Sequence, residues 1–194
     1  MSYEWKREKM KKQDLEFLKN LVEAPSPSGY EAPAAAVLRE RLEKSADNVS
    51  TNVMGSVHAE LKAKGAKQSV MLAGHIDEIG LMVNYISPEG YISFKAIGGV
   101  DAAILPGMRV MVHTASGDYL GVMGRKPIHL IETEERTNVT KIEKLFIDMG
   151  MGGEEVKKIV RIGDCITFNI DFVEFGKDLI VSRAMDDKMG AWIS

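Results

Sequence analysis

The chain has 194 residues, of which 45% are hydrophobic and 27% charged, and its 18 glycines and 6 prolines are too few for a collagen-like or linker-dominated protein. A net charge of −3 gives no electrostatic basis for nucleic acid or an anionic membrane surface as the main partner. The single Cys165 cannot form an internal disulfide and no run approaches 18 consecutive apolar residues, so we expect a cytoplasmic protein that does not span a membrane.

Two amphipathic helices are predicted near the start of the chain. Over residues 14–24 the leucines recur at helical spacing, with Asp14 as a plausible N-cap and Pro25 ending the helix. After the loop at residues 25–29, a second helix has Pro33 in its first turn, where proline is tolerated. Its predicted apolar face comprises Ala34, Val37, Leu38 and Leu42.

Short extended segments follow these helices and recur near the other end. Residues 49–61 are predicted to be extended, with an interruption at Gly55. The continuous apolar run at residues 69–74 is typical of a strand covered on both faces, and a second such run lies at residues 179–181. Both ends of the chain therefore favour an α/β layer.

The middle of the chain has a different character, with many short strands and frequent turns. This pattern indicates a small β-barrel or sandwich, interrupted by one helix at residues 154–160. We therefore expect an α/β layer, an inserted β module and a return to the α/β layer. The predicted strands of the module are residues 81–86, 91–97, 110–114, 119–123 and 165–170.

Two polar motifs follow apolar strands and could carry chemistry. His75 and Asp77 point to the same side of an extended chain, and a metal-binding imidazole needs its second ring nitrogen held by such a carboxylate. Asp186 and Asp187 are adjacent carboxylates that are costly to bury unless a cation or a helix N-terminus compensates them. Taken alone, the first pair is better explained by a surface loop and the second by a helix cap.

Together, the two motifs supply one imidazole and a carboxylate able to bridge two ions. Hydrolases with two metal ions about 3.5–4 Å apart need such a bridge. The motifs GHIDEIG at residues 74–80 and RAMDDKMG at residues 183–190 resemble the two N-proximal signatures of the dinuclear-metal aminopeptidases that form tetrahedral particles. Further segments resemble the same family, at residues 25–29, 98–101, 121–130, 146–150 and 162–164.

The resemblance implies a three-layer α/β/α metallopeptidase domain, incomplete in this chain, with an inserted small β-barrel used for dimerisation. It places the first part of the catalytic domain at residues 1–76, the barrel at 77–178 and the return to the catalytic domain at 179–194. It further implies removal of N-terminal residues from peptide substrates and a homo-oligomer built through the barrel.

The resemblance also implies roles for single residues. His75 ligates one of two divalent metal ions, zinc or cobalt, and Asp186 bridges both ions. Asp77 belongs to the catalytic residues as the group that orients His75, and Asp187 shapes the turn beside Asp186.

The chain departs from the family pattern because the general-base glutamate and the other ligands are expected beyond Ser194. We therefore expect little or no activity from these residues alone. Two alternatives remain: a non-enzymatic assembly module, and an amidohydrolase or deacylase with the same kind of metal site. The role of His129 stays open, because it follows Pro127 in a loop that resembles the family. We expect no catalytic role for the remaining polar candidates, which are Glu134, Glu135, Glu154, Glu155, His58, His113 and Cys165.

Overall fold

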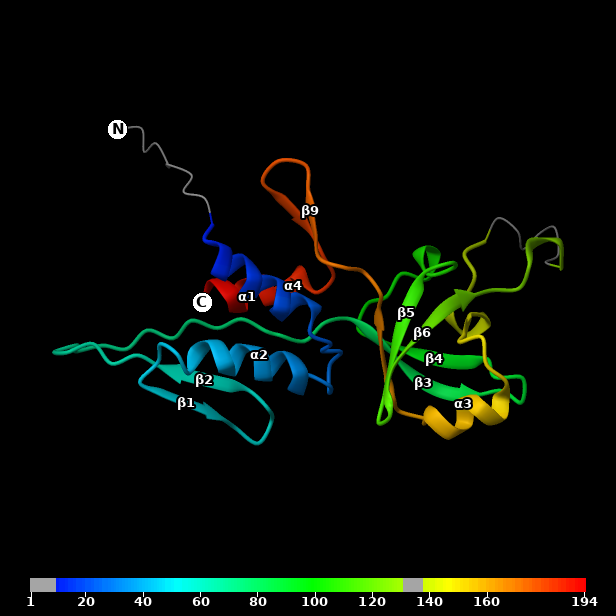
Figure 1. The fold of residues 1–194 in the computed structure, drawn as a ribbon, viewed down its shortest axis with the longest axis horizontal. Coiled ribbons are helices and arrows are strands. Elements are labelled where there is room, and N and C mark those ends of the chain that lie inside the picture. The colour runs from blue at the N-terminus through cyan, green and yellow to red at the C-terminus, as the bar shows by residue number, and fades with distance from the viewer. Residues whose placement is uncertain (1–9, 131–137) are drawn as a thin grey trace.

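The computed structural model describes residues 10–130 and 138–194. Helices and two small hairpins occupy one end of the molecule, and a β-barrel occupies the other (Figure 1). The fold class is therefore mixed α/β with an inserted β-barrel, as expected, although the domain boundaries remain predictions. Within the described ranges, no helix is both long and apolar enough to cross a bilayer.

Three helices form the helical end: α1 (Lys12–Glu23), α2 (Ala32–Leu42) and α4 (Met185–Ile193). Helix α1 packs against α2 and α4, and its Leu18, Leu21 and Val22 are fully buried. The predicted N-cap is wrong, because α1 begins before Asp14, which lies in the first turn and pairs with Arg41 at 2.8 Å. The placement of Pro33 in the first turn of α2 is confirmed.

Two antiparallel hairpins flank these helices. Strands β1 (Asn48–Thr51) and β2 (Val57–Glu60) enclose Gly55, whose φ of 88° suits the turn between them. Strands β9 (Val173–Phe175) and β10 (Leu179–Val181) form the second hairpin. The prediction of a strand at residues 179–181 is confirmed, but it is not covered on both faces: Leu179 is 61% exposed and Val181 46%.

The predicted strand at residues 69–74 is wrong. These residues have no strand pairing, and Val70 and Met71 are 86% and 85% exposed. A continuous apolar run becomes a buried strand only when neighbouring strands pair with it and helices cover it, and no described strand does so. Instead, the segment between β2 and β3 extends along the helical end towards the barrel (Figure 1).

The barrel is closed by six strands in the order β3-β4-β7-β6-β5-β8. Five of these strands match predicted strands. The sixth, β7, lies between β4 and β6 and pairs with both. Sequence analysis missed β7 because three residues are too few to show an alternating pattern. The strands are β3 (Gly80–Ile86), β4 (Ile92–Ile97), β5 (Arg109–Thr114), β6 (Gly117–Gly124), β7 (Phe146–Asp148) and β8 (Cys165–Phe168).

One contiguous apolar core fills the barrel. Its members include Leu81, Val110 and Ile166, all fully buried. Helix α3 (Gly153–Ile159) contributes Val156 to this core, which confirms the helix predicted at residues 154–160. Short 3-10 turns connect the strands at η1 (Ala102–Ile104), η2 (Ile128–Leu130) and η4 (Ile142–Lys144).

Candidate metal centre

His75 lies at the end of the extended segment, where the chain passes against helix α4. A Cβ atom added to Gly74 would lie only 2.4 Å from the backbone nitrogen of Ala191, so only glycine permits this close approach. The approach brings the His75 imidazole to Asp186, whose Oδ1 lies 3.3 Å from Nε2. Residues 111 positions apart in the sequence are thus juxtaposed.

Asp77 holds the opposite side of the His75 ring. Its Oδ1 lies 3.0 Å from His75 Nδ1, as the shared side of the extended chain predicts. The Ser28 hydroxyl donates a hydrogen bond of 2.5 Å to Asp77 Oδ2. This bond from Ser28 is the main reason that the pKa of Asp77 lies below its ordinary value.

The two adjacent aspartates have different environments. The Asp186 side chain is 96% exposed and faces His75, so it avoids the cost of burying a carboxylate. Asp187 Oδ1 accepts a hydrogen bond of 3.0 Å from the Gly190 backbone nitrogen, which caps the start of the helical turn. The helix-capping interpretation therefore holds for Asp187 but not for Asp186.

This donor set fits one side of a divalent metal site. An imidazole nitrogen and a carboxylate oxygen face each other, and a second carboxylate holds the opposite ring nitrogen, as in many metal-bound histidines. Over residues 10–130 and 138–194, no group of three or more His, Cys, Asp or Glu side chains converges to hold a metal ion. The described residues therefore provide two facing ligand atoms and one orienting carboxylate.

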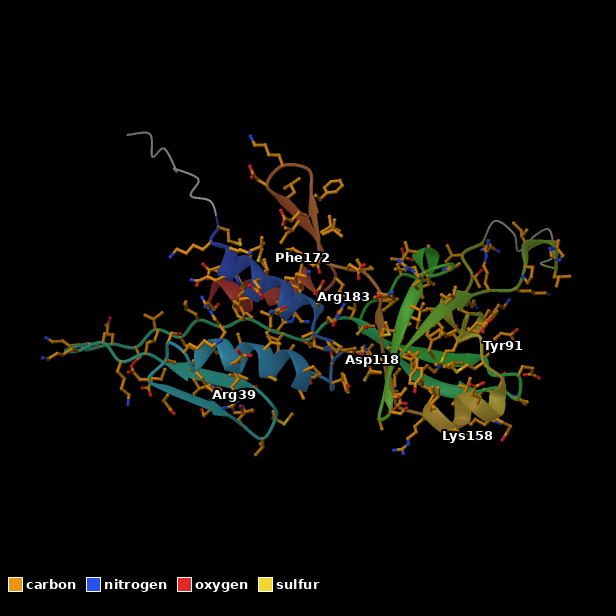
Figure 2. The ribbon with its side chains drawn as sticks, in the orientation of Figure 1. Arg39, Tyr91, Asp118, Lys158, Phe172 and Arg183 are labelled. Atoms are coloured by element: carbon orange, nitrogen blue, oxygen red, sulfur yellow. The ribbon has the colours of Figure 1, made fainter. Side chains whose placement is uncertain are left out.

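A buried polar network, which sequence analysis missed, lies directly behind these residues. The Glu78 side chain is 3% exposed, and its Oε1 accepts hydrogen bonds from the backbone nitrogen of Ser26 and from Arg183. Lys188 is fully buried, lies 3.7 Å from Glu78 and donates to the carbonyl of Ala24 at 2.6 Å. Figure 2 labels Arg183 on the side of the helices that faces the barrel.

Burial lowers the pKa of Lys188 to about 8, although the nearby Glu78 carboxylate opposes that change. The only signal in the sequence was that Glu78, Arg183 and Lys188 belong to the two motifs of the candidate site. Their contacts join residues more than 100 positions apart, which local patterns do not reveal.

The other histidines lie away from the facing pair of His75 and Asp186. His113 is buried between Asp118 at 2.8 Å and Thr167 at 2.9 Å, and it stacks on Tyr30, which confirms a satisfied histidine. His58 contacts Asn52 at the surface, and His129 lies in the short turn η2.

Glu154 and Glu155 lie in the first turn of α3, as predicted from the helix dipole. Burial raises the pKa of the Cys165 thiol, which disfavours a nucleophilic thiolate. The pair Glu134 and Glu135 lies outside the described residues.

Comparison with known proteins identifies the family of this chain. Residues 55–194 match the family described as M42 glutamyl aminopeptidase. The lysyl aminopeptidase of Pyrococcus furiosus is 31% identical over 180 residues, which cover 91% of this chain and 51% of that protein. The chain therefore belongs to the M42 glutamyl aminopeptidase family.

Solved structures show the same fold. A TET aminopeptidase from the archaeon Thaumarchaeota archaeon SCGC AB-539-E09 has a TM-score of 0.88 and 34% identity, covering 93% of this chain and 51% of that one. The Pyrococcus horikoshii TET1 peptidase, which can assemble into a tetrahedron or a large octahedral shell, has a TM-score of 0.81 and 29% identity, covering 92% and 53%. The chain thus spans about half the length of each of these relatives.

Proposed function

We propose that the chain supplies one side of a dinuclear metal centre in an aminopeptidase that removes N-terminal residues from peptides. The observation that carries this proposal is the facing pair His75 Nε2 and Asp186 Oδ1, 3.3 Å apart, in a chain of the M42 family. An amidohydrolase or deacylase would use the same pair, but no contact among the described residues favours it.

Each residue of the site has a defined task. His75 Nε2 and Asp186 would hold the metal ions, zinc or cobalt, with Asp186 bridging the two. Asp77 Oδ1 accepts a hydrogen bond from the Nδ1–H of His75. This bond favours the tautomer in which Nε2 is unprotonated and can act as a ligand atom. Metal ions held by these residues would supply Lewis acidity, which suits the polarisation of a scissile carbonyl and the activation of a water molecule. Ser28 fixes Asp77 from the side opposite His75.

Metal binding tests the proposed ligands directly. Zn²⁺ and Co²⁺ titrations of the chain, followed by calorimetry or NMR, are expected to show binding that His75→Ala or Asp186→Ala removes. His58→Ala is the matched control, because this histidine is exposed and its ring forms a hydrogen bond with Asn52. Equal binding by the wild-type chain and His75→Ala would contradict the proposed centre.

Peptidase activity is a separate proposal. We expect the chain alone to turn over aminoacyl substrates slowly or not at all with added zinc or cobalt, because a positioned general base contributes about 10²–10⁴-fold. Turnover at a rate typical of enzymes would show that a base lies within these residues.

We also propose that the barrel mediates self-association in the cytoplasm. Support comes from the TET1 peptidase, a similar protein that can assemble into a tetrahedron or a large octahedral shell. The same observation favours an assembly module as a second candidate function if the chain proves inactive. The single cysteine suits a reducing compartment. Light scattering that reports a stable monomer at high concentration would count against self-association.

A further inference from the structure

We propose that Glu78 is a positioning residue of the metal centre: one of its carboxylate oxygens holds together three segments, of which the first carries Ser28, the second His75 and Asp77, and the third Asp186. This inference rests on the proposed function, because it concerns the same two ligand atoms. In the proposed centre, the buried Glu78 carboxylate neither binds the metal ions nor contacts substrate.

The contacts of Glu78 converge on a single atom. Oε1 accepts hydrogen bonds from Ser26, from the backbone nitrogen at 2.9 Å and from the hydroxyl at 3.3 Å. Arg183 contacts the same oxygen, and Lys188 Nζ lies 3.7 Å away. In return, the Glu78 backbone nitrogen donates to the Ser26 carbonyl at 2.9 Å. One oxygen therefore ties together residues 26, 78, 183 and 188.

Each of the segments joined in this way carries one part of the site. The loop at residues 25–29 contains Ser28, which fixes Asp77 at 2.5 Å. The segment at residues 75–78 carries His75 and Asp77. The segment at residues 183–188 carries Asp186 between its two cations. A shift of any one segment would change the 3.3 Å separation of the two ligand atoms.

Charge explains why a carboxylate is needed at this position. Arg183 and Lys188 are both withdrawn from water, with side chains 10% and 0% exposed, and buried cations are strongly destabilising without an anionic partner. Both cations also bind carbonyls at the end of α1, those of Glu23 and Ala24. A glutamine at position 78 would keep an acceptor for Ser26 but would remove the carboxylate that pairs with both cations.

Glu78 is a positioning residue because it is shielded from substrate. Its side chain is 3% exposed, whereas those of His75 and Asp186 are 56% and 96% exposed. Its effect on the metal centre must therefore act through the segments it connects.

The test compares Glu78→Gln with the wild-type chain in two measurements. A Co²⁺ titration followed by NMR is expected to show affinity reduced by about 10–100-fold, as for other groups that orient metal ligands. Hydrogen exchange is expected to accelerate in residues 74–80 and 182–190, while residues 109–114 in the barrel keep wild-type rates. Glu154→Gln, which neutralises an exposed glutamate on α3, is the matched control.

The outcomes separate this inference from the proposed function. If His75→Ala binds Co²⁺ as the wild-type chain does, the metal centre is wrong, and the exchange rates of Glu78→Gln alone decide whether Glu78 joins the segments. Unchanged exchange in both segments overturns the inference, and so does faster exchange throughout the barrel with unchanged Co²⁺ affinity.

A second variant covers the case in which Glu78→Gln does not fold. Arg183→Lys keeps the charge but replaces the two guanidinium nitrogens that contact Glu78 and the Glu23 carbonyl with a single ammonium on a flexible stem. Weaker Co²⁺ binding by this variant supports the inference, and wild-type binding overturns it.

Discussion

The barrel and the helical end of the molecule are held together by different interactions. The barrel between Leu81 and Phe168 contains the contiguous apolar core, built from aliphatic and aromatic side chains of every strand. The helical end buries a few apolar side chains of α1, and it also buries the charged side chains of Glu78 and Lys188. Non-directional apolar burial stabilises the first region, whereas directional ion pairs and hydrogen bonds organise the second.

This contrast explains where the candidate site lies. Apolar packing tolerates small displacements of a side chain, but a metal site needs its donor atoms held to within fractions of an ångström. The residues that approach His75 are accordingly fixed by polar contacts, such as that of Ser28 with Asp77, and by the close passage of Gly74 along α4. The barrel carries none of the proposed ligands.

The largest expected effect comes from emptying the barrel core. Leu81→Ala removes a fully buried side chain and is expected to lower the free energy of unfolding of the barrel by about 2–5 kcal/mol. Urea unfolding followed separately by amide NMR signals of the two regions measures it. Leu120→Ala, on the exposed side of β6, is the control and should change stability by less than about 0.5 kcal/mol. Identical shifts of the urea midpoint in both regions would show that the molecule unfolds as one cooperative unit, which would contradict the separate stabilisation of the two regions.

A smaller effect is expected at the helical end from Gly74→Ala. The new methyl group would lie 2.4 Å from the Ala191 nitrogen, so the segment must move away from α4, at a cost of about 1–3 kcal/mol. Hydrogen exchange in α4 and the metal affinity of the chain measure this movement. Gly99→Ala is the control, because no atom lies within 4 Å of its added methyl group. Wild-type exchange in α4 for Gly74→Ala would contradict the close approach.

Ser28→Ala is expected to act on one carboxyl group without disturbing the fold. Loss of the hydroxyl removes the main cause of the lowered Asp77 pKa, so that pKa rises towards its ordinary value. A lowered carboxyl pKa stabilises the folded chain above the ordinary carboxyl pKa, and this stabilisation is lost as the pH falls through the lowered value. A ¹³C NMR titration of the metal-free chain measures the shift. Ser45→Ala, at an exposed serine, should leave the Asp77 pKa unchanged.

The smallest expected effect concerns the reactivity of Cys165 in the barrel wall. Because burial raises the pKa of this thiol, less thiolate is present at pH 8, and alkylation by iodoacetamide should be slower than for glutathione. The same thiol in urea-unfolded chain provides the control and should react at the ordinary rate. Faster alkylation in the folded chain would show that its environment favours the thiolate.

Sequence patterns predicted most local structure and part of the candidate site. Helical spacing located α1 and α2, turn residues located the barrel hairpins, and the two-residue period of an extended chain placed His75 beside Asp77. Local pattern was not enough at residues 69–74, where the predicted strand does not form. An apolar run specifies a preference for burial, but strand formation also needs a partner strand, which no local pattern supplies.

The amino-acid sequence by itself determined the helices, the hairpin turns, the β-rich character of the middle segment and the motifs resembling those of the family. Only the tertiary structure brought His75 to Asp186, and only it showed Glu78 between Arg183 and Lys188. Periodicity and turn chemistry act over a few residues, so they can be predicted from the local sequence. Ligand pairs and buried charge networks join segments about 100 residues apart, and their geometry exists only after the chain has packed.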